Sequence, residues 1–182
     1  MEAPRTAPEP PIEAALPDTS AVPTTVADLR IPPRLRAEWE APALERWPAD
    51  LRARHRDTTG DLRERRADFD GDGLSDAAFF LRNRQARSAE RRDSTYAVVV
   101  VFGAGGDTLL GVFSWAEAMG TLGAGLEVYP PRTLHHLGSE EEEDIGSPVV
   151  LEHPALSLMY FGKSEVTWFW REGSFHRIWT AD

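Results

Sequence analysis

Hydrophobic and polar residues follow two different periods along this chain, and the period changes near residue 61. From Ile31 to His55, apolar residues recur at spacings near three and four, which is typical of an amphipathic helix. These residues are Leu35, Trp39, Leu44, Trp47 and Leu51. Because Pro42 and Pro48 interrupt the hydrogen-bond ladder of a helix, the segment predicts one or two short helices whose apolar stripe docks on a sheet.

After residue 61 the period is close to two, and β-branched and aromatic residues cluster, which predicts strands. The expected strands are 77–81, 96–102, 108–115, 126–129, 149–151, 155–160, 166–171 and 174–180. Turn-forming residues at 103–106, 162–164 and 172–173 suit hairpins between antiparallel neighbours. Segments 82–95 and 130–148 are polar and predict loops. The predicted fold class is α+β, mainly β: an antiparallel β meander with short N-terminal helices packed on it.

The most apolar strands are expected to be buried. Tyr96–Phe102 is apolar almost throughout, which predicts a central strand covered on both faces, with the N-terminal helices as one cover. Trp168 and Trp170 share one face of a strand, and we interpret them as core residues together with Phe175 and Trp179. Exposure of the same tryptophans would instead form a stacking platform for a sugar or a peptide.

The first residues differ in composition from the rest. Residues 1–27 hold six prolines among Ala, Thr and Glu and lack the apolar core of a signal peptide. We expect residues 1–27 to be a disordered tether, and residues 28–182 to form a single domain. Such a tether often lies between a removed export signal or lipid anchor and a folded domain. A cytoplasmic start with a flexible tail explains the same residues.

Charge and composition exclude several classes of protein. The formal net charge of -10 disfavours nucleic acid as a partner, because phosphate binding needs a basic field. We interpret the clustered arginines Arg63, Arg65 and Arg66 as part of a solvated, partly ion-paired face. No stretch approaches the ~20 apolar residues of a transmembrane segment. The absence of cysteine excludes disulfides, thiol chemistry and cysteine-based zinc sites.

One segment carries the pattern of a metal site. Between residues 68 and 76, aspartates occupy positions 1, 3, 5 and 9 of a loop, and a glycine occupies position 6. Calcium takes six to eight oxygen ligands, and this spacing points alternate side chains inward while the glycine permits the sharp turn. The expected ligands of a calcium ion (Ca2+) are water, the side chains of Asp68, Asp70, Asp72 and Asp76, and the main-chain carbonyl of Leu74.

A surface turn without a metal is the alternative, but four unpaired carboxylates around one turn would repel one another. Position 12 is Phe79, so the bidentate glutamate of an EF-hand is missing, and the loop runs into a strand.

The stretch Ala67-Asp-Phe-Asp-Gly-Asp-Gly-Leu-Ser-Asp-Ala-Ala-Phe-Phe-Leu81, with Gly60-Asp61 before it, resembles the calcium loop and strand of FG-GAP and VCBS-type repeats. Propellers repeat this unit once per blade, whereas it occurs once here. From Ile31 onward, the layout is also similar to bacterial exported proteins of unknown function that carry one such motif. The resemblance implies an extracytoplasmic location, periplasmic or lipid-tethered, and gives no activity.

We therefore expect a non-enzymatic extracytoplasmic binding or accessory module, stapled by Ca2+, whose partner is a protein or an envelope component. The histidines show neither HExxH spacing nor a nucleophile-elbow pattern. The alternative is a hydrolase, or an inhibitor of one, that uses the C-terminal aromatic strands and the acidic loop as its contact surface. Glycoside hydrolysis would need two of Glu152, Glu165 and Glu172 at the required separation.

Overall fold

Antiparallel strands dominate the parts of the chain that the structure, a computed structural model, describes. These parts are residues 29–42, 61–85, 95–113, 124–135, 148–160 and 164–181. They contain no α-helix, and no helical segment within them has the length and apolar character needed to cross a bilayer. The predicted β architecture is therefore confirmed for the described residues.

The first sheet has five strands in the order β1-β3-β4-β5, with β2 also paired to β3. Its strands are β1 (Trp39–Glu40), β2 (Glu64–Ala67), β3 (Asp76–Asn83), β4 (Tyr96–Val101) and β5 (Asp107–Phe113). All of its described pairings are antiparallel, and β3, β4 and β5 follow one another as the predicted meander.

The second sheet has four strands in the order β11-β10-β9-β6. Its strands are β6 (Ala124–Tyr129), β9 (Ala155–Tyr160), β10 (Ser164–Arg171) and β11 (Ser174–Ala181). A separate two-stranded ribbon, β7 (Thr133–Leu134) with β8 (Val149–Val150), lies in the chain between β6 and β9. The interpretation of 130–148 as loop alone was thus wrong at β7, which is too short to show a period.

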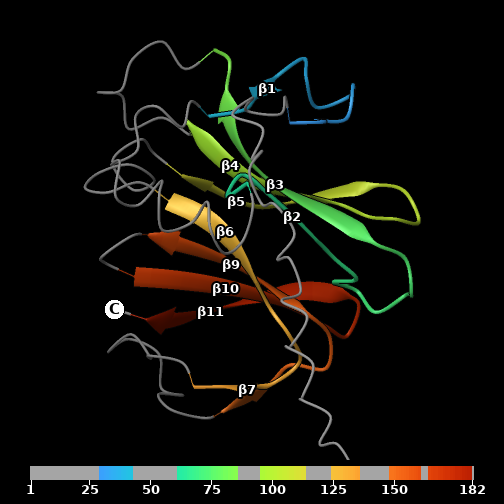
Figure 1. Ribbon diagram of the computed structural model, residues 1–182, viewed down its shortest axis with the longest axis vertical. Helices are drawn as coiled ribbons and strands as arrows, with labels where there is room; N and C mark the ends of the chain where they lie inside the picture. Colours follow the sequence, from blue (N-terminus) through green and yellow to red (C-terminus); the bar gives the residue numbers. More distant parts are fainter. Residues whose placement is uncertain are drawn as a thin grey trace, which may run out of the picture.

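The two larger sheets pack face to face, and Figure 1 shows the first sheet above the second. One buried cluster joins them, because alternate residues of β3 and β4 meet the inner residues of the second sheet. Phe80 and Val98 from the first sheet, and Leu158 and Trp168 from the second, belong to this cluster. The fold is a two-layer sandwich around one main core.

The predicted burial of β4 on both faces is confirmed, but its second cover is not helical. Residues 29–42, which we call the N-terminal strap, form turns such as that closed by the Leu35 N–H on the Pro32 carbonyl (2.9 Å). The strap then joins the edge of β3 as β1, where Trp39 pairs with Asn83. Pairing with β3 satisfies the backbone in place of a helical ladder, so the helix prediction was wrong for these residues.

The strap still docks as its apolar pattern predicted. Of the predicted stripe, Trp39 is buried and Leu35 packs against the same cluster on the outer face of the first sheet. Leu29 and Ile31, which were not part of the predicted stripe, are also buried there. The other stripe residues, Leu44, Trp47 and Leu51, lie outside the described residues, as does the expected tether at 1–27.

The closing hairpin formed as predicted, but its aromatic residues differ in exposure. Glu172 and Gly173 have φ angles of 52° and 81°, as a two-residue hairpin turn requires. Trp168 is 2% exposed in the main core, whereas Trp179 is 39% exposed and stacks on Tyr160. The predicted burial of Trp179 was wrong, because β11 is an edge strand of its sheet.

Candidate metal centre

The predicted metal loop, residues 68–76, connects β2 to β3 and is called the aspartate loop below. Phe69, its second residue, is fully buried in the main core and anchors the loop to the sandwich. Gly71 and Gly73 have φ angles of 76° and 87°, a region that other residues seldom adopt. The two glycines turn the chain sharply, so that its acidic side chains converge.

Asp68, Asp70 and Asp76 come together. Each offers a carboxylate oxygen, and these three oxygens lie within 4.8 Å of one another. Carboxylate oxygens are the ligands that hard divalent cations prefer. The residues at positions 1, 3 and 9 of the loop therefore form a cluster that could hold a metal ion.

Backbone amides fix the orientation of the Asp68 carboxylate. The Gly71 N–H donates to one oxygen at 2.8 Å, and the Gly73 N–H donates to the other at 2.9 Å. Each carboxylate oxygen has two lone pairs, so this cradle leaves acceptor capacity for a cation.

Asp72 and Leu74 lie outside the three-residue cluster. Asp72 is exposed, and its carboxylate accepts the Leu74 N–H at 2.7 Å in a local turn. The Asp70 carboxylate accepts the Asp72 N–H at 3.1 Å in the same manner. The roles of Asp72 and of the Leu74 carbonyl as ligands stay predictions.

Asp76 joins the aspartate loop to a second part of the fold. Its side chain is fully buried, and its two oxygens accept the Phe69 N–H and the Gly103 N–H, both at 2.8 Å. Gly103 lies in the turn between β4 and β5, and a Cβ atom there would lie 2.7 Å from the Leu74 Cβ. Sequence reasoning treated Gly103 only as a hairpin residue and missed its close packing on the loop.

His153 was also missed. This residue lies between β8 and β9, and its ring covers Gly71 so closely that a Cβ there would be 2.2 Å from Cε1. The segment between β8 and β9 thereby contacts the loop from outside. No periodicity or motif in the sequence pairs residues this far apart.

The negative charge of the aspartate loop has no cationic partner among the described residues, since none of the ion pairs there includes a loop aspartate. Burial raises the pKa of Asp70, and the hydrogen bond from the Asp72 N–H partly offsets this effect. The nearby carboxylates of Asp76, Asp72 and Asp68 raise the pKa further, so the net shift is upward. The charged form of Asp70 is thus disfavoured until a cation offsets the repulsion.

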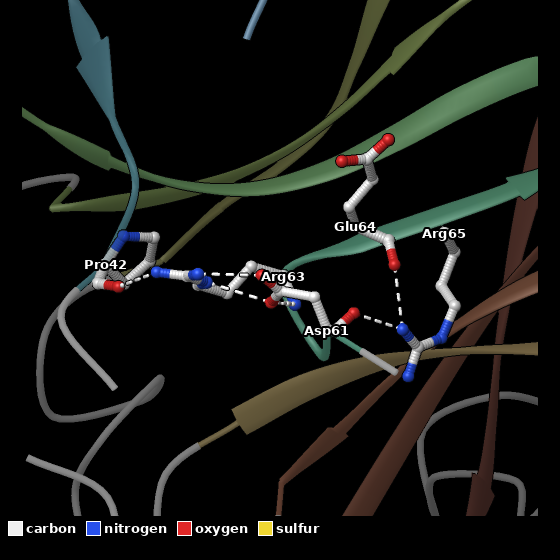
Figure 2. A network of polar contacts seen from close by, with 5 residues as sticks. All are labelled: Pro42, Asp61, Arg63, Glu64 and Arg65. Atoms are coloured by element: carbon white, nitrogen blue, oxygen red, sulfur yellow. Dashed lines mark hydrogen bonds and ion pairs between the residues drawn. The ribbon is translucent and has the colours of Figure 1, made fainter. Parts of the chain in front are cut away.

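The arginines that precede the loop are structural, and our interpretation of them as a solvated face was wrong for Arg63 and Arg65. Arg63 is 4% exposed, and its guanidinium donates two hydrogen bonds to the Asp61 carboxylate, at 2.9 and 2.7 Å (Figure 2). It also donates to the Pro42 carbonyl at 3.0 Å. Arg65, also buried, donates to the Asp61 and Glu64 carbonyls. This network fixes the end of the strap against the start of β2.

The same network determines how Asp61 titrates. Burial alone would raise the pKa of the Asp61 carboxyl, but hydrogen bonds and charge from Arg63 and the charge of Arg65 lower it below its usual value. Because the pKa of Asp61 is lowered in the fold, its charged carboxylate stabilises the folded state at neutral pH. This stabilisation is lost as the pH falls through the lowered pKa.

Glu165 and Glu172, two of the glutamates considered for hydrolysis, lie far apart. Glu165, near the start of β10, accepts hydrogen bonds from the hydroxyls of Ser157 and Tyr129. Glu172 lies in the turn beyond the other end of β10, so roughly 20 Å of strand separates it from Glu165. Glycosidases hold their two carboxyls at about 5 to 9.5 Å.

Comparisons of the chain with protein-family models, with curated proteins and with solved structures gave no match.

Proposed function

We propose that this protein is a non-enzymatic binding or accessory module whose sandwich is stapled by one calcium ion in the aspartate loop. The ligands would be Asp68, Asp70, Asp72, the Leu74 carbonyl and Asp76, as the spacing of these residues in the loop predicts. The resemblance to FG-GAP and VCBS-type loops supports an extracytoplasmic location, and there we propose a protein or an envelope component as partner.

One observation carries the proposal: three carboxylates converge at the expected positions of the loop, and none of them has a cationic partner among the residues that the structure describes. A turn without a metal would be expected to spread such charges apart or to pair them with arginine. The sequence supplies arginines immediately before the loop, yet they bind Asp61 and Glu64. The loop instead directs backbone N–H groups at its aspartates and keeps their charges together.

The hydrolase or hydrolase-inhibitor alternative has one observation in its favour, the exposed ring of Trp179 beside Tyr160. Against it, Trp168 is buried in the core and Trp170 is half-buried. The separation of Glu165 from Glu172 also argues against that pair as an acid and base.

Calorimetric titration tests the proposal. We expect one calcium ion to bind with a dissociation constant of ~0.1 to 1 mM, the range of extracellular modules, and magnesium to bind much more weakly because it dehydrates reluctantly. Asp72→Ala should weaken calcium binding at least about tenfold, as loss of a charged ligand does. Glu38→Gln, which removes an exposed carboxylate from the strap, should leave it unchanged. Absence of calcium binding by the parent protein would reject the proposal.

The calcium effect should also depend on pH in a definite direction. Because the pKa of Asp70 is raised above 3.8 in the cation-free fold, protons and calcium compete for this carboxylate. Without calcium, protonation of Asp70 stabilises the fold at acid pH, because its pKa is higher in the folded protein than its usual value. This stabilisation is lost as the pH rises through the raised pKa. The difference in Tm between calcium-saturated and cation-stripped protein should therefore be small near pH 3.8 and grow toward neutrality. A difference that shrinks with rising pH would contradict this linkage.

A further inference from the structure

A second element contacts the turn that Asp76 holds. This turn, residues 102–106, is closed by the Phe102 N–H on the Gly106 carbonyl at 3.1 Å and by the Gly105 N–H on the Phe102 carbonyl at 3.0 Å. Figure 1 shows the aspartate loop (green) and this turn (yellow) at the same end of the molecule, on the right. These two hydrogen bonds hold the ends of the turn together.

The N-terminal strap grips the far side of this turn through one side chain. Arg34 donates to the Gly106 carbonyl at 2.8 Å and forms an ion pair with Asp107 at 2.7 Å. We call these two contacts the Arg34 clasp. Arg34 and Asp107 are separated by 73 positions in the sequence, so the clasp is a tertiary contact that ties the strap to the β4–β5 hairpin.

Little freedom exists between the clasp and the loop. Gly103 donates to buried Asp76, and a Cβ atom on Gly103 would lie 2.7 Å from the Leu74 Cβ and 3.0 Å from the Ser75 carbonyl oxygen. A displacement of the aspartate loop must therefore move the turn, and a displacement of the turn shifts the groups that Arg34 grips.

We propose that the Arg34 clasp couples cation occupancy of the aspartate loop to docking of the N-terminal strap, so that each stabilises the other. This inference rests on the proposed calcium site and adds its regulation. Thermodynamic linkage is reciprocal. If bound calcium favours docking of the strap by some factor, docking of the strap through the clasp must strengthen calcium binding by the same factor, and loss of the clasp must weaken it. Arg34 and Asp107 are positioning residues, since neither is among the proposed ligands.

The strap offers a matched control at its other end. There, Glu40 forms an ion pair with Arg82 at 2.5 Å, and this pair has an exposure similar to that of the clasp. Arg82 lies near the end of β3 opposite to Asp76, so the pair is remote from the aspartate loop along the strand. Glu40→Gln should loosen the strap equally with and without calcium and leave calcium affinity unchanged. Arg34→Met removes every donor of the clasp and keeps the apolar stem.

Calcium titration and hydrogen exchange of peptides covering residues 29–42 test the coupling on the full chain. Calcium should slow exchange of the strap in the parent, and Arg34→Met should remove this calcium-dependent part and weaken calcium affinity about two- to fivefold, the scale of a half-exposed ion pair. Electrostatics alone predicts the opposite sign, because losing a positive charge near the loop favours a cation.

The outcomes separate the coupling from the proposed function. If calcium raises the Tm of the parent but leaves hydrogen exchange of the strap unchanged, the coupling is wrong and the calcium site stands. The same conclusion follows if Arg34→Met binds calcium as tightly as the parent or more tightly. Equal calcium affinities of Arg34→Met and Glu40→Gln also overturn the coupling. If the parent does not bind calcium, both proposals fail.

Discussion

Replacing Asp76 by alanine should lower the free energy of unfolding by about 3 to 6 kcal/mol even without calcium, because two hydrogen bonds to a charged acceptor are worth about 1.5 to 3 kcal/mol each. Both bonds are buried, and the substitution would leave the N–H groups of Phe69 and Gly103 without this acceptor. Urea denaturation in the presence of a chelator measures the loss.

The matched comparison is Asp70→Asn. Asp70 is a member of the same cluster, but its carboxylate accepts only a local bond from the Asp72 N–H, and asparagine keeps an acceptor there. This variant should lose no stability in chelator. A loss below about 1 kcal/mol for Asp76→Ala would mean that the bridge between the loop and the β4–β5 turn does not stabilise the fold.

Trp168→Ala should be the most damaging substitution in the closing strands, at about 3 to 5 kcal/mol, the usual result of removing a large aromatic side chain from a core. Trp168 packs in the cluster between the sheets, with its ring edge-on to that of Phe113 at 6.3 Å. Trp179→Ala should cost no more than about 1 kcal/mol, because this residue is 39% exposed.

The two variants also distinguish a core position from an exposed one. Chemical denaturation of both variants and of the parent measures the loss in the free energy of unfolding that each substitution causes. Similar losses for the two would show that Trp179, on the edge strand β11, is covered as well as Trp168 on the inner strand β10.

The strands were predictable because their signal is local. Period-two alternation and β-branched residues place β4, β9 and β10 within a few residues of their observed bounds, and Glu172-Gly173 defines its own hairpin. The short strand β2 was missed, since its sequence Glu-Arg-Arg-Ala carries no apolar alternation and it forms only by pairing with β3.

The rest depends on contacts between distant segments. Apolar spacing identified the strap as a cover for the sheet but not its backbone, because pairing with β3 competes with a helix only in the folded chain. Burial of Arg63 follows from the proximity of Asp61 and Pro42 in the fold. The spacing of the aspartates did predict their cluster, because that signal is local. The close approach of His153 to Gly71, and of Gly103 to Leu74, has no local signature in the sequence.

Thermal melting of the parent and of Asp70→Asn, each in chelator and in saturating calcium, tests the calcium staple most directly. Saturation at about a hundredfold over the dissociation constant should stabilise the parent by roughly 2.7 kcal/mol. In chelator Asp70→Asn should melt above the parent, because burial and the acidic neighbours of Asp70 raise its pKa and so disfavour its charged form. In calcium the order should reverse, with the parent melting higher. A parent protein whose Tm does not change with calcium, or an unchanged order of the two proteins, would contradict the calcium site.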